Sequence, residues 1–247
     1  MPPIIVKTLK AVLEIGYYPL LCQLAIRKYA REEPSVSNVT EAFEFACRFK
    51  AGLHIRGLFL NFAPLQNRSE ILSLLQILQA QKPKYLCEIG TASGGTLYLF
   101  SKVASQDARL VSVDLPGGAF GAGYQKSKMQ FLKKFASDKQ EILLVRDDSH
   151  SERARLKLEN LLNGKKLDFL LIDGDHSYNG VKADFMTYRS LVSKGGLIAF
   201  HDIVPGDPRF VGGVPAFWAE IKVDFKHAEF VDSWNQGGAG IGVLWND

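Results

Sequence analysis

Acidic and imidazole side chains gather in two short segments in the second half of the chain. LIDGDHSYNG contains Asp173, Asp175 and His176, and IAFHDI contains His201 and Asp202. Each segment overlaps the end of an apolar run typical of a buried strand. Carboxylate and imidazole groups that converge from neighbouring strand ends can hold a divalent cation, which binds a substrate hydroxyl and lowers its pKa. The pattern predicts a divalent-cation site formed from among these five residues.

A glycine-rich turn in CEIGTASGGTLYLF, residues 87 to 100, is a second candidate for chemistry. Gly90, Gly94 and Gly95 stand where a predicted strand passes into a predicted helix, and free amides at a helix start can face a polar ligand. The G-x-x-x-G-G spacing departs from the dinucleotide pattern G-x-G-x-x-G. Taken alone, the turn indicates only a nucleotide-type site.

Polar residues at the next two predicted strand ends narrow this interpretation. Asp114 lies 24 residues after Gly90, where a carboxylate can accept hydrogen bonds from both ribose hydroxyls. In VRDDSH, at the end of the third predicted strand, Asp147, Asp148 or Ser149 could meet an adenine amine. Glycine turn and strand-end acids together favour recognition of a nucleoside.

These residues require a scaffold that brings strand ends together. Short β-branched runs alternate with helical patterns from residue 84, which indicates a parallel sheet covered by helices. The predicted strands are 84–89, 109–114, 141–147, 167–173 and 196–202, followed by 227–234 and 239–246, which Gln236, Gly237 and Gly238 join as a hairpin. The predicted helices are 38–52, 67–81, 93–104, 124–137, 151–163, 178–193 and 212–222. The fold class is therefore α/β: a Rossmann-like, doubly wound, seven-stranded and mainly parallel sheet with an antiparallel C-terminal hairpin, plus N-terminal helices.

The N-terminal part is expected to form a helical extension over residues 1–60, before a catalytic domain over residues 61–247. Residues 1–30 are rich in apolar side chains, but no uninterrupted apolar run reaches the roughly 18 residues that a membrane span needs. Two explanations stand for this segment. It is a membrane-surface or partner-binding helix pair broken near Pro19, or, as we favour, a helical cap packed on the main domain or on a dimer partner.

Composition excludes some classes of partner. The chain of 247 residues carries 30 Lys plus Arg against 26 Asp plus Glu, a formal charge of +4 that is too small to indicate nucleic acid. Cys22, Cys47 and Cys87 form no metal-binding or disulfide pattern, which favours reduced thiols and a cytoplasmic protein. We expect a homo-oligomer that acts on a small molecule.

The motifs resemble those of the class I S-adenosylmethionine-dependent methyltransferases, especially the cephalosporin hydroxylase-like or macrocin-type O-methyltransferases. The resemblance covers about residues 60 to 247 and rests on CEIGTASGGT, VSVDLPGG, LLIDGDHSYNGVKADF, GGLIAFHDI and GVPAFWAEIK. It implies S-adenosylmethionine as the cofactor and methyl transfer to a hydroxyl of a sugar, glycolipid or other secondary metabolite.

The resemblance also implies roles for individual residues. Glu88 would lie near the methionine part of the cofactor, and Asp114 would bind its ribose. The turn residues that would line the cofactor are Gly90, Thr91, Ser93, Gly94 and Gly95, with Asp148 and Ser149 at the adenine end.

Asp173 and Asp202 match acids that bind magnesium in related metal-dependent O-methyltransferases. His201 departs from that pattern, and because imidazole suits manganese, iron or zinc better, the metal is left open between magnesium, manganese and other ions. His176 matches a general base of some sugar O-methyltransferases, so His176 and Asp173 are the predicted catalytic residues. The alternative for His176 is a helix-start residue hydrogen-bonded to Asp175 or to a backbone amide.

Several features stay open at this point. Gln66, Asn67, Glu70 and Tyr178 are further candidates to face the substrate, and the loops 116–123 and 205–213 are candidate walls or lids. The alternative functions are a nicotinamide-dependent oxidoreductase and a non-catalytic nucleoside-binding or membrane-associated protein. Acceptor pockets are built by loops, so the acceptor itself is not predicted.

Overall fold

The computed structural model describes residues 17–52, 59–117, 126–137 and 139–247. Its α-helices are α2 (Tyr18–Glu32), α3 (Val39–Arg48), α4 (Arg68–Gln81), α5 (Gly95–Val103), α6 (Lys126–Leu132), α7 (Glu152–Leu162), α8 (Tyr178–Tyr188), α9 (Pro208–Val211) and α10 (Val214–Ile221). Its strands are β1 (Ala51–Gly52), β2 (Phe59–Leu60), β3 (Tyr85–Ile89), β4 (Arg109–Asp114), β5 (Glu141–Arg146), β6 (Leu167–Ile172), β7 (Val192–His201), β8 (His227–Phe230) and β9 (Ile241–Asn246).

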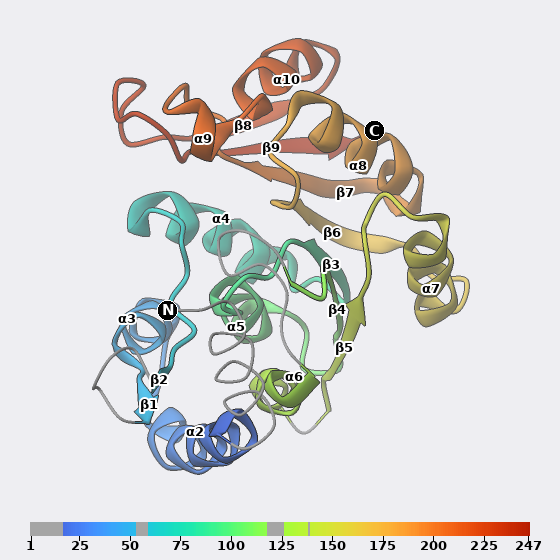
Figure 1. The fold of residues 1–247 in the computed structure, drawn as a ribbon. Helices are drawn as coiled ribbons and strands as arrows, with labels where there is room; N and C mark the ends of the chain where they lie inside the picture. The colour runs from blue at the N-terminus through green and yellow to red at the C-terminus, as the bar shows by residue number, and fades with distance from the viewer. Residues whose placement is uncertain (1–16, 53–58, 118–125, 138) are drawn as a thin grey trace, which may run out of the picture.

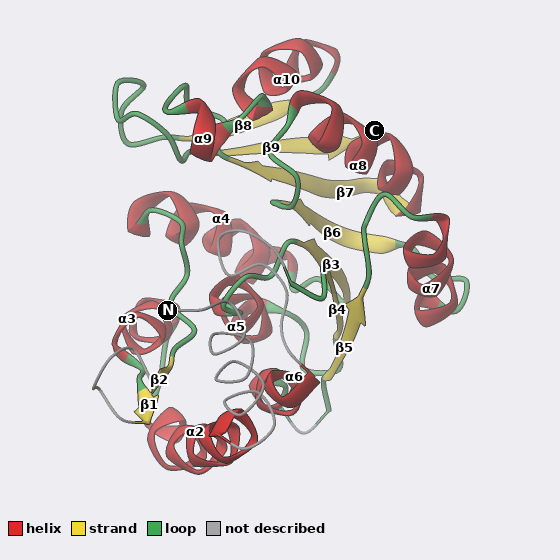
Figure 2. Ribbon diagram, viewed as in Figure 1, coloured by secondary structure: helices red, strands yellow, loops and turns green. Residues whose placement is uncertain are grey.

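A seven-stranded sheet organises the molecule, in the order β5-β4-β3-β6-β7-β9-β8. The first five strands of that order pair in parallel, whereas β9 pairs antiparallel with both β7 and β8. This confirms the predicted α/β class and its antiparallel C-terminal edge. Helices cover both faces, with α4, α5 and α6 on one side and α7, α8 and α10 on the other (Figures 1 and 2).

Alternation along the strands supplies both faces with apolar side chains. In β3, Leu86 packs on the side of α4, α5 and α6, whereas Cys87 and Ile89 pack on the opposite side. Successive strand side chains point to opposite faces, so neighbouring apolar residues of one strand supply two cores at once. This explains why the central strands are mainly apolar in the sequence and do not alternate with polar residues.

The order of strand addition reverses next to β3. The chain adds β4 and β5 on one side of β3 and then returns to add β6 on the other. In open parallel sheets, ligands bind outside the carboxyl ends of the strands at such a switch point. The ends of β3 and β6, at Ile89 and Ile172, therefore mark the expected site.

The described N-terminal helices pack on the sheet domain. Leu21, Ala25 and Tyr29 of α2 are buried in the same core as Phe131 and Phe135, and the Tyr29 ring meets the Phe131 ring edge-on. Pro19 lies in the first turn of α2, where its missing N–H costs no hydrogen bond. Residues 1–16, the first half of the predicted helix pair, lie outside the described residues. Among the described helices, none is long and apolar enough to span a membrane.

Several elements differ from the prediction. The predicted helix 38–52 ends at Arg48, and a short β1–β2 pair begins at Ala51. The predicted helix 178–193 also ends early, since α8 ends at Tyr188 and β7 begins at Val192. In addition, α9 forms inside the predicted loop 205–213. The C-terminal hairpin is correct in pairing, but β8 ends at Phe230, so the connection is a longer loop over residues 231–240.

Glu70 of α4 explains the length of this connection. It is buried, with 1% of its surface exposed. Its carboxylate accepts hydrogen bonds from Gly240 N at 2.9 Å, Gln236 Nε2 at 2.6 Å and Asp232 N at 3.3 Å. Glu70 therefore holds the loop against α4. The backbone N–H groups of the loop that bind Glu70 are not available to extend the pairing of β8 with β9.

We predict that Glu70→Ala lowers the free energy of unfolding by about 2 to 3 kcal/mol, because it leaves buried donors unsatisfied. Urea unfolding followed by circular dichroism measures this change. The matched control is Glu44→Ala, which removes an exposed ion pair with Arg68 and should cost less than about 0.5 kcal/mol. Equal losses for the two variants would contradict this role of Glu70.

Candidate active site

The carboxyl ends of β3 and β6 approach each other closely at Gly90. This residue has φ +86°, and a Cβ atom there would lie 1.9 Å from the carbonyl oxygen of Asp173. Asp173 N in turn donates to Ile89 O at 2.9 Å. Only glycine fits this position, because it tolerates both the positive φ and the contact. The glycine turn and the candidate catalytic acid are thus adjacent.

Asp114 organises the glycine turn. Its Oδ2 accepts hydrogen bonds from the amides of Thr91 at 3.0 Å and Ala92 at 3.1 Å, and its Oδ1 accepts one from Leu115 N at 2.8 Å. Gly95 fits closely as well, since a Cβ there would lie 2.2 Å from Pro64 N.

Residues of α8 hold the segment 148–150, which follows β5. Tyr188 donates from its hydroxyl to Ser149 O at 2.6 Å, and His150 Nε2 lies 3.2 Å from Gly180 O and 3.4 Å from a carboxylate oxygen of the buried Asp184. Positions 180, 184 and 188 share one face of a helix. These contacts fix the segment where Asp148 and Ser149 were predicted to meet adenine.

Asp147, the third candidate at that strand end, is occupied by other residues. It forms ion pairs with Arg153 at 2.6 Å and with Lys157 at 2.9 Å. The Arg153 hydrogen bond is the main cause that holds the pKa of Asp147 well below its usual range, assisted by Lys157. Asp147 therefore anchors the start of α7.

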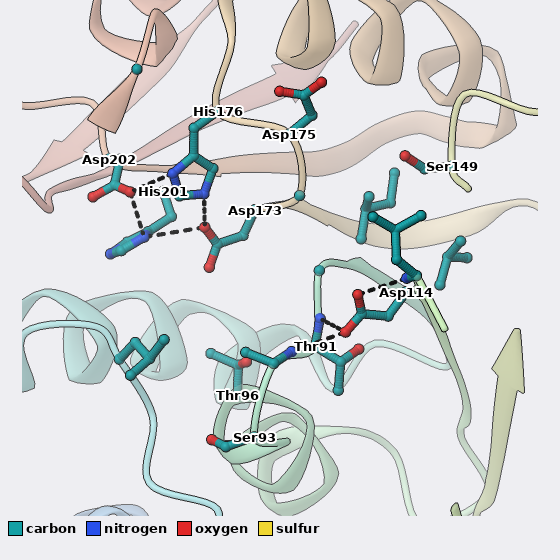
Figure 3. A pocket seen from close by; sticks show the side chains of 18 of the residues that line it. Thr91, Ser93, Thr96, Asp114, Ser149, Asp173, Asp175, His176, His201 and Asp202 are labelled. Carbon is teal, nitrogen blue, oxygen red and sulfur yellow. Dashed lines mark hydrogen bonds and ion pairs between the residues drawn. The ribbon is translucent and has the colours of Figure 1, made fainter. Parts of the chain in front are cut away.

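Four residues converge at the opposite end of the pocket from Asp114 (Figure 3). Asp173 Oδ1 lies 3.2 Å from His201 Nδ1 and 3.3 Å from His176 Nε2. His176 Nδ1 lies 3.2 Å from Asp202 Oδ2. We call Asp173, His176, His201 and Asp202 the acid–imidazole cluster.

Neighbouring loops hold this cluster in place. Gln66 Nε2 donates to Asp173 Oδ2 at 2.9 Å, and Phe210 O lies 2.5 Å from His176 Nδ1. A carbonyl oxygen only accepts, so Nδ1 carries the proton and Nε2 is the nitrogen left to exchange one. Asp202 has φ +63°, a sparsely populated conformation, while its Oδ1 accepts from Ala239 N at 3.0 Å.

Mutual contacts shift the pKa values of the cluster. Burial alone would lower the pKa of His176, but hydrogen bonding and charge from Asp173, together with Phe210 O and Asp202, raise it to about 9. Burial would raise the pKa of Asp173, but the charge of His201 and the His176 contact hold it well below its usual range. The isolated cluster is thus an ion-pair network in which His176 is protonated at neutral pH.

The donor set fits a divalent cation. Asp173, His201 and Asp202 each offer one ligand atom, and the three atoms lie within 4.8 Å of one another. Ligand atoms about 2.1 Å from one cation lie roughly 3.0 to 3.4 Å apart. His201 Nδ1 lies 3.2 Å from Asp173 Oδ1 and 3.6 Å from Asp202 Oδ2. Two carboxylates and one imidazole suit manganese, iron or zinc better than magnesium.

A single cavity of about 750 Å³ connects the glycine turn with the acid–imidazole cluster. Most predicted site residues line it, namely Gly90, Thr91, Ser93, Gly95, Asp114, Asp148, Ser149, Asp173, His176, His201 and Asp202. Two do not. Gly94 packs against Leu132, and Glu88 is buried behind the wall, where Thr96 Oγ1 donates to its Oε1.

Of the further candidates to face the substrate, some line the cavity and others have structural contacts elsewhere. Gln66 lines the cavity, whereas Glu70 holds the 231–240 loop and the Tyr178 hydroxyl donates to Glu220. The glycine-rich loop 116–123 lies largely outside the described residues. The predicted wall 205–213 contributes Pro208, Arg209, Phe210 and Gly212 to the cavity, whereas Leu65, which also lines it, was not predicted. An exposed apolar residue in a loop carries no periodic signal, so only its position in space identifies it.

Comparisons with known proteins indicate the family and fold of this chain. Residues 87–203 match a family model described as a methyltransferase domain. The uncharacterized protein R132 of Acanthamoeba polyphaga mimivirus is 30% identical over 161 residues, which cover 65% of this chain and 67% of that protein. Rhamnosyl O-methyltransferase of Mycobacterium tuberculosis is 25% identical over 173 residues, 64% of this chain and 65% of that enzyme. An O-methyltransferase from Bacillus cereus, solved with S-adenosylhomocysteine, superimposes with a TM-score of 0.54 at 19% identity, covering 74% of this chain and 84% of the other.

Glu88 generates a pH-dependent prediction. Burial raises its pKa from 4.5 to about 8, helped by the charges of Asp173 and Asp114 and opposed by the Thr96 hydrogen bond. The folded protein therefore keeps a proton that the unfolded chain releases, so this group makes stability fall as pH rises from about 4.5 to about 8. Glu88→Gln removes the titration.

We expect the melting temperature of Glu88→Gln, relative to the unsubstituted protein, to rise between pH 5 and pH 8.5 in the absence of cofactor. Differential scanning fluorimetry across that range measures the difference, and the exposed Glu152→Gln is the control for the loss of a surface carboxyl. A pH-independent difference for Glu88→Gln would show that this carboxyl does not carry the shifted pKa.

Proposed function

The chain belongs to the class I S-adenosylmethionine-dependent methyltransferases, and we propose that it transfers the methyl group of this cofactor to a hydroxyl of a small molecule. The observation that carries the proposal is the acid–imidazole cluster, which opens on the same cavity as the glycine turn. Methyl transfer to oxygen needs a deprotonated or polarised hydroxyl next to the sulfonium. Carboxylate and imidazole groups at that position suit this chemistry.

In this proposal the cofactor occupies the β3, β4 and β5 side of the cavity. Asp114 accepts hydrogen bonds from the ribose hydroxyls, while Asp148 and Ser149 meet adenine. Gly90, Thr91, Ser93 and Gly95 line the cofactor, and Gly94 supports the turn from behind. Glu88 acts near the methionine part through Thr96, since Thr96 lines the cavity and contacts Glu88.

Asp173, His201 and Asp202 are the proposed ligands of a divalent cation. Such a cation would bind the acceptor oxygen and lower the pKa of its hydroxyl. Gln66 holds one oxygen of Asp173 and leaves the other for the cluster. The strained Asp202 backbone, fixed by Ala239 N, aims its carboxylate at the same point.

His176 is the proposed general base. With Nδ1 held by Phe210 O, its Nε2 accepts the proton of the acceptor hydroxyl. The oxygen forms a bond to the methyl carbon while the bond from carbon to sulfur breaks, and the electron pair stays on sulfur to give S-adenosylhomocysteine. A general base must start as a neutral imidazole, whereas Asp173 and Asp202 raise the pKa of His176. The positive charge of a divalent cation at these two carboxylates would offset their effect and so favour the neutral form of His176.

A sugar or secondary-metabolite hydroxyl is the proposed acceptor, supported by the likeness to the mycobacterial rhamnosyl O-methyltransferase. A nicotinamide-dependent oxidoreductase is not favoured, because the matching family model is a methyltransferase domain. The domain boundary near residue 60, the homo-oligomer and the cytoplasmic location stay predictions.

We expect turnover to require a divalent cation. Release of S-adenosylhomocysteine with a panel of hydroxylated acceptors should stop after treatment with a chelator and return more fully with manganese than with magnesium, because of the His201 imidazole.

The substitution His176→Ala should lower kcat by about 100-fold or more, because it removes the proposed general base. Its affinity for S-adenosylhomocysteine should change less than about twofold, because His176 lies at the acceptor end.

His227→Ala is the control for loss of an imidazole, since His227 is exposed on β8. It should keep full activity. Methyl transfer that survives the double change Asp173→Ala and His176→Ala would overturn the catalytic assignment, and full activity after metal removal would overturn the cation.

A further inference from the structure

Residues 63–70 contact both ends of the cavity. They lie after β2 and include the first residues of α4. Four of them line the cavity, namely Ala63, Pro64, Leu65 and Gln66. Hydrogen bonds and direct packing along one chain segment can carry a change at one site to another. The contacts of this segment therefore bear on whether the cofactor end and the acceptor end of the cavity act independently.

Two contacts fasten this segment to the glycine turn. Ser93 Oγ donates a hydrogen bond to Ala63 O at 2.7 Å. A Cβ atom at Gly95 would lie 2.2 Å from Pro64 N and 2.5 Å from Pro64 Cα, so the two backbones are in direct contact. Close-packed groups transmit small displacements to one another. A ligand that orders the glycine turn therefore also orders residues 63 and 64.

Gln66 reaches the acid–imidazole cluster from the same segment. It is buried, and its Nε2 donates to Asp173 Oδ2 at 2.9 Å. With that oxygen held, Asp173 Oδ1 faces His201 Nδ1 at 3.2 Å and His176 Nε2 at 3.3 Å. Hydrogen bonds to a ligating carboxylate fix its orientation. The Gln66 amide therefore sets which oxygen of Asp173 is presented to a cation.

The second carboxylate of the cluster depends on Glu70. Its Oε2 accepts a hydrogen bond from Gly240 N at 2.9 Å, and the neighbouring Ala239 N donates to Asp202 Oδ1 at 3.0 Å. Both carboxylates of the proposed cation site are thus held by residues 63–70, directly or through one loop. Loss of such supporting contacts typically lowers metal affinity by about 10- to 100-fold.

We propose that Gln66 is a positioning residue for Asp173, and that residues 63–66 couple binding of the cofactor to binding of the cation. The inference rests on the proposed function and adds a linkage between its two binding sites. A cofactor that orders the glycine turn also holds Ala63 and Pro64, which keeps Gln66 on Asp173 before the cation binds. Linkage is reciprocal, so the cation raises the affinity for the cofactor by the same factor.

Manganese binding with and without S-adenosylhomocysteine measures this linkage. Electron paramagnetic resonance of free manganese during a titration gives the two dissociation constants at one pH. S-adenosylhomocysteine lacks the sulfonium charge of the methyl donor, so repulsion between that charge and manganese does not contribute. We expect saturating S-adenosylhomocysteine to tighten manganese binding about fivefold or more.

Two variants locate the linkage. Gln66→Met keeps the length of the side chain but removes its donor. Manganese should then bind about tenfold more weakly without S-adenosylhomocysteine, and the enhancement by S-adenosylhomocysteine should fall below about twofold. Ser93→Ala removes the contact with Ala63 at the other end. The enhancement should fall here too, while manganese affinity without S-adenosylhomocysteine stays within about twofold.

Controls separate positioning from a general loss of structure. A residue that only stabilises the fold would change manganese affinity equally with and without S-adenosylhomocysteine, so the ratio of the two dissociation constants is the decisive readout. Gln76→Met is the matched control, because Gln76 is exposed on α4 and does not line the cavity. A melting curve checks each variant, and Ser93→Ala decides alone if Gln66→Met does not fold.

Each outcome decides. Equal manganese affinity with and without S-adenosylhomocysteine, no manganese binding under either condition, or an enhancement that is unchanged in Gln66→Met or in Ser93→Ala overturns the inference. The expected linkage in a protein that methylates no acceptor supports the inference but contradicts the proposed function. Methyl transfer by a protein that binds the two ligands independently supports the proposed function and overturns the inference.

Discussion

The close approach of the β3 and β6 ends is the constraint on which the site depends. A side chain at Gly90 would collide with the backbone of Asp173, which follows β6. The glycine turn and the end of β6 can therefore lie this close only because position 90 is glycine. This contact places amides that can face a nucleoside beside a carboxylate that can face an acceptor. Sheet topology then brings β7, with His201 and Asp202, to the other side of β6. Binding and chemistry are therefore neighbours because of strand order.

Charge compensation is the second requirement of this arrangement. Acids at neighbouring strand ends repel one another unless each has a partner, and the chain provides different partners along the row. Asp147 is offset by basic residues of α7, Asp114 by backbone amides, and Asp173 by two imidazoles. Among the residues that the structure describes, only the acid–imidazole cluster combines such partners with ligand atoms that suit a cation. The methyl acceptor is therefore expected at this end of the cavity.

The sheet and most of the site could be predicted from the sequence because both follow from local patterns. Apolar runs that end in aspartate identified β4, β5, β6 and β7, and the position of the strand ends on one edge of the sheet predicted that Asp173 and Asp202 lie near each other. Long-range pairing could not be predicted. Glu70 is as polar as a surface residue, yet it holds a loop 170 residues away. The segment 205–213 was a candidate wall, but the contact of Phe210 with His176 could not be predicted, because it depends on a backbone carbonyl and on a short helix with no periodic pattern.

Anomalous diffraction from crystals grown with S-adenosylhomocysteine and manganese tests the central claim most directly, because it locates the cation relative to the cofactor. The account predicts one manganese peak about 2.0 to 2.3 Å from ligand atoms of Asp173, His201 and Asp202, with the cofactor sulfur facing it across the cavity. A cavity that holds S-adenosylhomocysteine at the glycine turn but shows no manganese at these three residues would contradict the account.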